Sequence, residues 1–131
     1  MSRGKTDRPR VLFVDDEVSL VALARFALER AGWELVAAHN GAQALEMFEE
    51  EHDTIDVVVL DLILPGISGD ELLDRMAAID DSVPVVIASG MEAHRIAEII
   101  GQRTQHFVHK PFSLMSLPAS LNAALSRAAA F

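Results

Sequence analysis

Five polar side chains that could take part in chemistry stand at the ends of short apolar runs. Asp15 and Asp16 follow VLFV, Asp61 follows VVVL, Ser89 follows VVIA and Lys110 follows HFVH. A carboxylate buried among apolar residues is strongly unfavourable when nothing compensates its charge. Asp61, which has apolar residues on both sides, is therefore a candidate for a functional position.

Brought together, these side chains would have a defined chemistry. Three carboxylates at one point repel one another, and a hard divalent cation such as Mg²⁺ relieves the repulsion because it prefers oxygen ligands. A metal beside a carboxylate attracts a phosphoryl group. Lys110 could neutralise one phosphoryl oxygen, and Ser89 could donate a hydrogen bond to another. The chain has no cysteine or tyrosine, so Asp61 is the candidate nucleophile and would form an aspartyl-phosphate.

Each of these residues also has an ordinary structural interpretation. An Asp-Asp pair after a strand commonly belongs to a helix N-cap, and a serine after a strand is commonly structural. Lys110 could be a surface lysine before a turn. The five residues together, each at the end of a strand, favour the functional interpretation.

Apolar runs alternate with amphipathic stretches five times, without an internal repeat or a linker. The pattern predicts strands at 10–15, 33–38, 56–60, 84–88 and 107–109, and helices at 17–31, 41–51, 69–79, 93–100 and from 117 to the C-terminus. The last helix should start after Ser116, because this start places Pro118 in the first turn, where proline is tolerated.

This alternation is typical of βαβ units. It predicts an α/β fold with a doubly wound five-stranded parallel sheet in the order 2-1-3-4-5. Ligands of such sheets bind at the carboxyl edge, where the winding switches direction between strands 1 and 3. All five polar residues fall at this edge, so Asp61 should lie at the mouth of a cleft above the core. Residues 10–131 should form this one domain, and residues 1–9 a short N-terminal extension.

Charge and composition exclude several other classes. The chain has 131 residues, a formal net charge of −9 and no cysteine. The charge disfavours binding to nucleic acid or to anionic membranes, and the lack of cysteine excludes disulfides and thiolate metal sites. No apolar run approaches the ~20 residues of a membrane span, and no secretory signal precedes the first strand. A cytoplasmic protein is expected.

The segments VLFVDDE, VVVLDLILPGISGDEL, PVVIASG and HFVHKPF together resemble the response-regulator receiver domains of two-component signal transduction. The resemblance covers about residues 10–128 and implies the flavodoxin-like three-layer sandwich of that family. It also implies that Asp61 is the phosphoacceptor, which takes the phosphoryl group of a phosphohistidine on a sensor histidine kinase or a histidine phosphotransfer protein. A Mg²⁺ ion would be held by Asp16, by Asp61 and by the backbone carbonyl of Ile63. Asp15 would hold the ion through a water molecule.

The resemblance also implies a conformational switch. After phosphorylation Ser89 would move toward the phosphoryl group and Phe107 would rotate inward, which would remodel the face made by the fourth helix, the fifth strand and the last helix. Without the family, Phe107 is a plain core residue of a strand. The remodelled face could bind an effector domain or a second copy, although the last helix carries a single charge, Arg127, which disfavours a dimer held by paired charges.

Four apolar residues add detail to the resemblance. Ile63 and Met91 lie two residues beyond the acceptor aspartate and the switch serine, at positions that flank the attacking water in this family. Because both are apolar, we expect slow self-dephosphorylation, unless the two residues only pack. Leu23 and Phe26 fall on the polar side of the first helix, which in receivers docks the phosphodonor, although single exposed apolar residues are common.

Two other functions remain open at the level of sequence. A degenerate receiver could act as a constitutive protein-interaction module, although all five site residues are present. An aspartyl-nucleophile phosphatase usually has a second acid two residues after the nucleophile, where this chain has Ile63. A receiver would catalyse only its own phosphorylation and dephosphorylation. The sequence names neither the kinase nor the output, and the chain could act alone or belong to a larger response regulator or hybrid kinase.

Overall fold

A computed structural model describes residues 8–90, 92–100, 106–109 and 115–129. Within these residues, strands alternate with α-helices along the whole chain. The strands are β1 (Arg10–Val14), β2 (Glu34–Ala38), β3 (Val57–Leu60), β4 (Val85–Ser89) and β5 (His106–His109). The helices are α1 (Val18–Arg30), α2 (Gly41–Glu51), α3 (Gly69–Ile79), α4 (Ala93–Ile100) and α5 (Leu117–Ala129), and a short 3₁₀ helix, His52–Thr54, follows α2.

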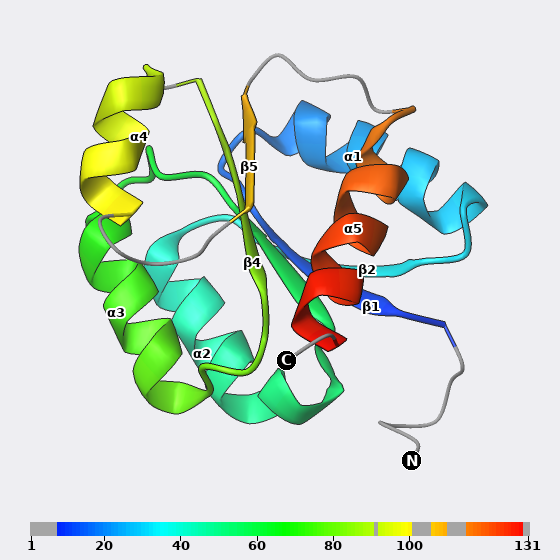
Figure 1. Ribbon diagram of the computed structural model, residues 1–131, viewed down its shortest axis with the longest axis horizontal. Coiled ribbons are helices and arrows are strands. Elements are labelled where there is room, and N and C mark those ends of the chain that lie inside the picture. Colours follow the sequence, from blue (N-terminus) through cyan, green and yellow to red (C-terminus); the bar gives the residue numbers. More distant parts are fainter. Residues whose placement is uncertain (1–7, 91, 101–105, 110–114, 130–131) are drawn as a thin grey trace.

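The strands form one parallel sheet in the order β2-β1-β3-β4-β5, as Figure 1 shows. This order confirms the predicted doubly wound fold, and the winding switches direction between β1 and β3. The predicted strands and helices are all present. Their ends differ from the prediction by at most one residue, except for α5, which was predicted to run to the C-terminus and is described as far as Ala129. The sequence pattern did not predict the 3₁₀ helix.

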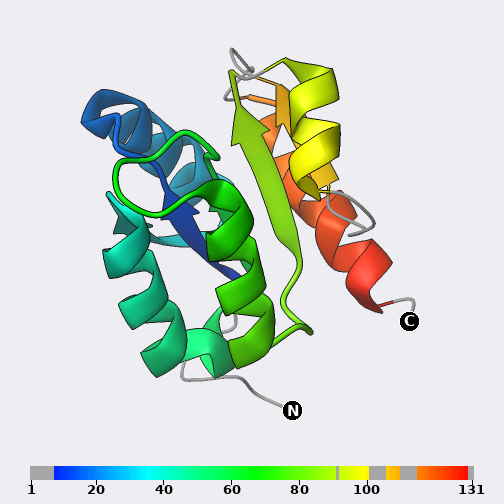
Figure 2. The ribbon, with the colours of Figure 1, turned by 90° about the vertical axis from the view of Figure 1, so that its left-hand side faces the viewer.

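Helices cover both faces of the sheet (Figure 2). Side chains of β1 alternate between two hydrophobic clusters, because successive residues of a strand point to opposite faces. Leu12 and Val14 pack in the cluster that includes residues of α2, α3 and α4. Val11 and Phe13 pack in the cluster that includes residues of α1 and α5. The central strands β1, β3 and β4 are therefore buried on both faces, as their continuous apolar sequences indicate.

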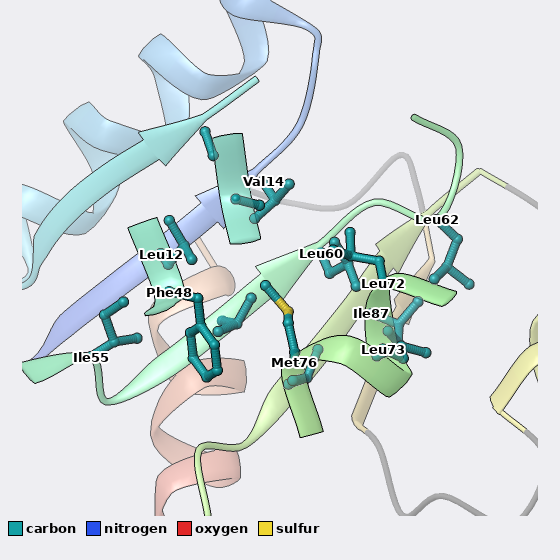
Figure 3. Packing of buried hydrophobic residues seen from close by; sticks show 14 of the residues in the cluster. Leu12, Val14, Phe48, Ile55, Leu60, Leu62, Leu72, Leu73, Met76 and Ile87 are labelled. Atoms are coloured by element: carbon teal, nitrogen blue, oxygen red, sulfur yellow. The ribbon is translucent and has the colours of Figure 1, made fainter. Parts of the chain in front are cut away.

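The first of these clusters lies under α2 and α3 (Figure 3). Phe48 of α2 and Met76 of α3 meet Leu12 and Leu60 of the sheet, and all four side chains are fully buried or nearly so. The apolar faces of α2 and α3 are thereby anchored to β1 and β3. This packing fixes the two strands whose carboxyl ends carry the acidic residues.

Local capping explains where several helices begin and end. The side chain of Asn40 accepts a hydrogen bond from the Gln43 backbone N–H at the start of α2, and Ser68 does the same for Glu71 at the start of α3. Side-chain caps of this kind satisfy backbone donors that the first turn leaves unpaired. Gly32, which follows α1, adopts a φ of 94°, a conformation that glycine reaches without strain.

The last helix starts where the sequence predicts. It begins at Leu117, and Pro118 is its second residue, so the missing proline N–H removes no helical hydrogen bond. Leu121 and Ala124 bury the inner face of this helix against the sheet. In the part of the chain that the structure describes, no helix combines the length and the apolar character that a membrane crossing requires.

Ion pairs join elements at the sheet edge opposite the acidic residues. The Arg10 guanidinium lies 2.6 Å from a carboxylate oxygen of Glu51. Nearby, the Nδ1 atom of His52 lies 2.7 Å from Oδ2 of Asp80, so the end of α2 is linked to the end of α3. Hydrogen bonds from Ser82, together with the contact to His52, lower the pKa of Asp80 below 3.8.

This lowered pKa predicts a pH-dependent contribution to stability. Because the folded chain holds the Asp80 proton less tightly than the unfolded chain does, the stabilisation is complete well above pH 3.8 and disappears as the pH falls through the lower, folded pKa. We expect Asp80→Asn to lower the free energy of unfolding by about 1 kcal/mol at pH 7, and by progressively less as the pH falls below 3.8 and through the folded pKa. Urea unfolding at several pH values measures the difference.

The adjacent exposed residue provides the control for this prediction. Asp81→Asn removes one acidic group from the same turn and should change the free energy of unfolding little at any pH. A destabilisation by Asp80→Asn that persists undiminished at acidic pH would contradict the assignment, because a protonated carboxyl cannot lose an ionic contact.

Candidate functional site

The register between β1 and β3 brings two acidic residues together. Val14 pairs with Leu60, so the residues that follow, Asp15 and Asp61, are the next opposing pair of the ladder. The backbone N–H of Asp61 donates to the carbonyl of Val14 at 3.0 Å, which shows that the pairing continues past the last strand residue. Opposing residues of neighbouring strands have their side chains on the same side of a sheet. Parallel pairing therefore aims both carboxylates at one place.

The backbone holds each of these two carboxylates in the same way. An Oδ1 atom of Asp15 accepts a hydrogen bond from the Glu17 N–H at 2.9 Å, and Oδ1 of Asp61 accepts one from the Ile63 N–H at 3.0 Å. An aspartate that bonds the backbone two residues further on forms a local turn. Each carboxylate is thus oriented by the loop that leaves its own strand.

Asp16 completes a cluster of three acids. Oxygen atoms of Asp15, Asp16 and Asp61 all lie within 4.8 Å of one another. Asp15 and Asp61 are buried, with 1% and 6% of their surface exposed, whereas Asp16 is exposed. Asp61 was predicted at the mouth of a cleft. It lies at the expected edge of the sheet, but its side chain is almost fully buried.

The cluster has the composition of a site for a hard divalent cation. The oxygen ligands of one Mg²⁺ ion lie about 2.1 Å from the metal and thus about 3 to 4 Å apart. Carboxylate oxygens within 4.8 Å of one another match this spacing when some bind directly and others through water. Three neighbouring carboxylates repel one another most strongly where water is excluded, and a cation between them removes this repulsion. The donor set therefore fits a metal ion.

Close packing positions the loop that follows Asp61. A Cβ atom on Gly69, the first residue of α3, would lie 2.7 Å from the side chain and 3.2 Å from the backbone of Leu62. A Cβ atom on Gly41, the first residue of α2, would collide with Ile67 in the same loop. Both glycines are buried at helix starts, so the loop rests directly on two helix N-termini.

The structure adds one residue that the sequence analysis did not single out. The Nδ1 atom of His39, which follows β2, lies 3.3 Å from the backbone carbonyl oxygen of Asp15. The backbone N–H of His39 also donates to the side chain of Gln43 at 2.8 Å. His39 therefore braces the acidic turn from the neighbouring strand. The sequence could have indicated this position, because His39 follows the apolar strand ELVAA and so falls at the same sheet edge as Asp15.

The remaining predicted site residues are described to different extents. Ser89 ends β4 and is fully buried at the same sheet edge. The backbone of Phe107 lies in β5, paired with Ile87, but the switch predicted for its side chain concerns atoms outside the described part of the chain. Lys110 and Met91 also lie outside the described residues, so their predicted roles stay predictions.

The apolar residues predicted to meet partners are on the surface. Leu23 and Phe26 are 55% and 65% exposed on α1, which confirms the side of the helix on which they were placed. The Arg30 guanidinium lies 5.5 Å from the centre of the Phe26 ring. Ile63, two residues beyond Asp61, is 56% exposed, so its side chain does not contribute to the core.

The comparisons with known proteins agree with this architecture. The family described as "Response regulator receiver domain" matches residues 11–122. The transcriptional regulatory protein TrcR of Mycobacterium tuberculosis is 35% identical over 120 residues, which are 90% of this chain and 46% of that protein. The sensory transduction protein RegX3 of Mycolicibacterium smegmatis is 36% identical over 121 residues, 91% of this chain and 51% of that protein. The chain thus spans about half the length of these curated relatives.

Solved structures give the same result at the level of the fold. A response regulator receiver domain protein from Clostridium thermocellum superposes with a TM-score of 0.83 at 28% identity, covering 91% of this chain and 95% of that one. The receiver domain of the hybrid histidine kinase CckA superposes with a TM-score of 0.75 at 31% identity, covering 88% of this chain and 98% of that one.

Proposed function

Because the chain belongs to the response regulator receiver family, we propose that Asp61 is the residue that accepts the phosphoryl group in its two-component signalling pathway. One observation carries the proposal. Asp61 is a buried carboxylate that lies, oriented by the Ile63 N–H, in a cluster with Asp15 and Asp16. A core carboxylate placed beside two others is unfavourable unless the site has a use for the charge.

The transfer reaction follows from the orientation of the Asp61 carboxylate. One of its oxygen atoms attacks the phosphorus of a phosphohistidine, the P–N bond breaks, and the imidazole leaves with the bonding electron pair. The bond from Ile63 N–H fixes the rotation of the carboxylate and so lowers the entropic cost of reaching the attacking geometry. Burial of the nucleophile limits access of competing water. Attack by water on the aspartyl-phosphate later returns the chain to its starting state, and these two self-reactions are the only catalysis proposed.

We propose Mg²⁺ as the metal of the acidic cluster. When bound, it would neutralise the carboxylates and the oxygens of the incoming phosphoryl group. Asp16, Asp61 and the backbone carbonyl of Ile63 would hold the ion directly, and Asp15 would hold it through water. Lys110 and Ser89 would contact the phosphoryl oxygens.

Ser89 also begins the proposed conformational response. Its hydroxyl would move toward the phosphoryl group, and the Phe107 side chain would fill the space that this movement opens. Because β5 lies between α4 and α5 along the chain, this change would reach the surface made by α4, β5 and α5. An effector domain or a second copy would bind there.

The phosphodonor is proposed to be a sensor histidine kinase or a histidine phosphotransfer protein in the cytoplasm. Leu23 and Phe26 on α1 would contact the donor, since they are large, exposed and apolar. The domain would extend over residues 10–131, preceded by a short extension at 1–9.

The central prediction concerns a covalent adduct. Incubation of the chain with a small acyl phosphate and Mg²⁺ should add one phosphoryl group, which intact mass spectrometry detects. The adduct should be absent in Asp61→Asn and in samples with a chelator in place of Mg²⁺. A full yield of adduct in Asp61→Asn would contradict the assignment, and no adduct under any condition would favour a constitutive interaction module.

A second prediction concerns the lifetime of the adduct. The side chain of Ile63 cannot form a hydrogen bond with an attacking water. Ile63→Asn should therefore speed the loss of the phosphoryl group by about tenfold, which corresponds to roughly one hydrogen bond gained in the transition state. Ile63→Leu, which stays apolar, should leave the rate unchanged. Decay is followed by mass after the donor is removed. A longer lifetime in Ile63→Asn would show that the side chain acts in another way.

A third prediction separates docking from chemistry. A histidine kinase that phosphorylates the wild-type chain should transfer its phosphoryl group to Phe26→Glu at a rate that is lower by about tenfold or more. A loss of this size is typical when a central apolar residue of an interface is removed. Phosphorylation by the small acyl phosphate should stay within about twofold of the wild type, because it needs no docking surface. Met115→Glu, an equivalent change at a residue that is 92% exposed, is the control. If Phe26→Glu lowered the phosphorylation rate equally with the kinase and with the small acyl phosphate, the substitution would be disturbing the phosphorylation site and not donor docking.

A further inference from the structure

The charge of the chain is concentrated in one part of the fold. Residues 41–81 contain 12 of the 20 acidic side chains and one of the 11 lysines and arginines, Arg75. This segment therefore carries a net charge of −11, and the rest of the chain carries +2. It comprises α2, β3 and α3, and the two helices lie side by side on one face of the sheet (Figure 2). The receiver site accounts for only one of these 12 acids, Asp61.

A groove runs between these two helices on the outer surface. It has a volume of about 560 Å³. Its lining residues come from both helices: Leu45, Glu46 and Glu49 of α2, and Arg75, Ala78 and Ile79 of α3. Leu45 and Ile79 are partly buried and pack against the core below. The groove thus has an apolar floor that joins the interior of the protein.

The rim of the groove is acidic. Glu46 and Glu49 are exposed, and within the described part of the chain neither has an ion-pair partner. The Arg75 guanidinium lies 2.6 Å from a carboxylate oxygen of Glu71 on the same helix, so its charge is already compensated. The groove therefore presents an uncompensated negative potential beside its apolar floor.

We infer that the α2–α3 groove docks a basic amphipathic helix of a partner protein. A cleft between two neighbouring helices fits a third helix, whose apolar stripe would cover Leu45 and Ile79. The small side chain of Ala78 lets that helix approach closely, and its flanking lysines or arginines would pair with Glu46 and Glu49. Since α2 has 11 residues, the contact would extend over about 16 Å, or three helical turns.

Charge decides between this occupant and the others. A second copy of the chain would bring an equally acidic face into contact, which repulsion disfavours. Nucleic acids and anionic lipids are repelled for the same reason. The groove lies on the opposite face of the sheet from Leu23 and Phe26 of α1, so it is distinct from the proposed docking surface for the phosphodonor. The inference does not depend on the phosphoryl chemistry.

The test uses a synthetic helix as the probe. A peptide of about 14 leucines and lysines, with the leucines on one helical face, is titrated into the full ¹⁵N-labelled chain. The amide signals of Glu46, Glu49 and Ala78 should shift most, with saturation. A second peptide, with serine in place of each leucine and the same charge, should bind at least tenfold more weakly, because it cannot cover the apolar floor.

Matched variants locate the binding site. Glu46→Lys/Glu49→Lys should lower the affinity for the leucine–lysine peptide by about tenfold or more, because two negative charges on the rim become positive. Glu92→Lys/Glu98→Lys changes the net charge equally at exposed positions outside the groove and should have less than about a twofold effect. Ala78→Gln, which fills the groove at an exposed position without adding a charge, should also weaken binding.

Several results would overturn the inference. If both charge-reversal variants lowered the peptide affinity equally, or if the serine peptide bound as tightly as the leucine–lysine peptide, binding would depend on net charge alone. Shifts centred on Asp15 and Asp61 or on Phe26 would place the binding elsewhere. A large gain in peptide affinity on removal of residues 1–8 would identify the basic N-terminal segment of the chain as the occupant. A dimer that sedimentation detects in the wild type and not in Glu46→Lys/Glu49→Lys would identify a second copy.

Discussion

The parallel pairing of β1 with β3 is the interaction on which the site depends. It sets Val14 opposite Leu60, and the hydrogen bond from Asp61 N–H to the Val14 carbonyl carries the pairing to the acidic residues. Side chains alternate along a strand with a period of two, so a slip of one residue would turn Asp61 to the other face of the sheet. Val57–Leu60 is buried on both faces, and the two hydrophobic clusters therefore hold the register that the chemistry needs.

The same packing allows an unfavourable group of charges to persist. Three carboxylates within 4.8 Å would separate if their loops were free to move. They are held because Ile63 and Glu17 donate backbone hydrogen bonds to two of them, and because the loop after β3 rests on the starts of α2 and α3. The fold thus maintains a local repulsion that a cation or a phosphoryl group with its metal would relieve. Binding should accordingly tighten the site, a coupling that favours a switch.

Much of this arrangement follows from the sequence because it depends on local patterns. Apolar runs of four or five residues and the position of Pro118 predict the elements to within one residue of their observed ends, apart from the end of α5. The convergence of Asp15, Asp16 and Asp61 follows from the strand order and from their positions at the carboxyl ends of two neighbouring strands. The contact of His39 with Asp15, the close approach of Gly41 and Gly69 to the loop, and the groove between α2 and α3 depend on distances between elements, which periodicity does not encode. The predictions for Lys110 and for the side chain of Phe107 concern atoms outside the described residues.

The most direct measurement is to identify the residue that carries the phosphoryl group. The chain is phosphorylated with a small acyl phosphate and Mg²⁺ and then treated with borohydride, which reduces an acyl phosphate to the alcohol and so converts a modified aspartate to homoserine. Peptide mass mapping then locates the homoserine. We predict conversion at position 61, with Asp15 and Asp16 unchanged. Conversion at either of those residues, or a phosphate that survives borohydride on a serine, would contradict the assignment of Asp61 as the phosphoacceptor.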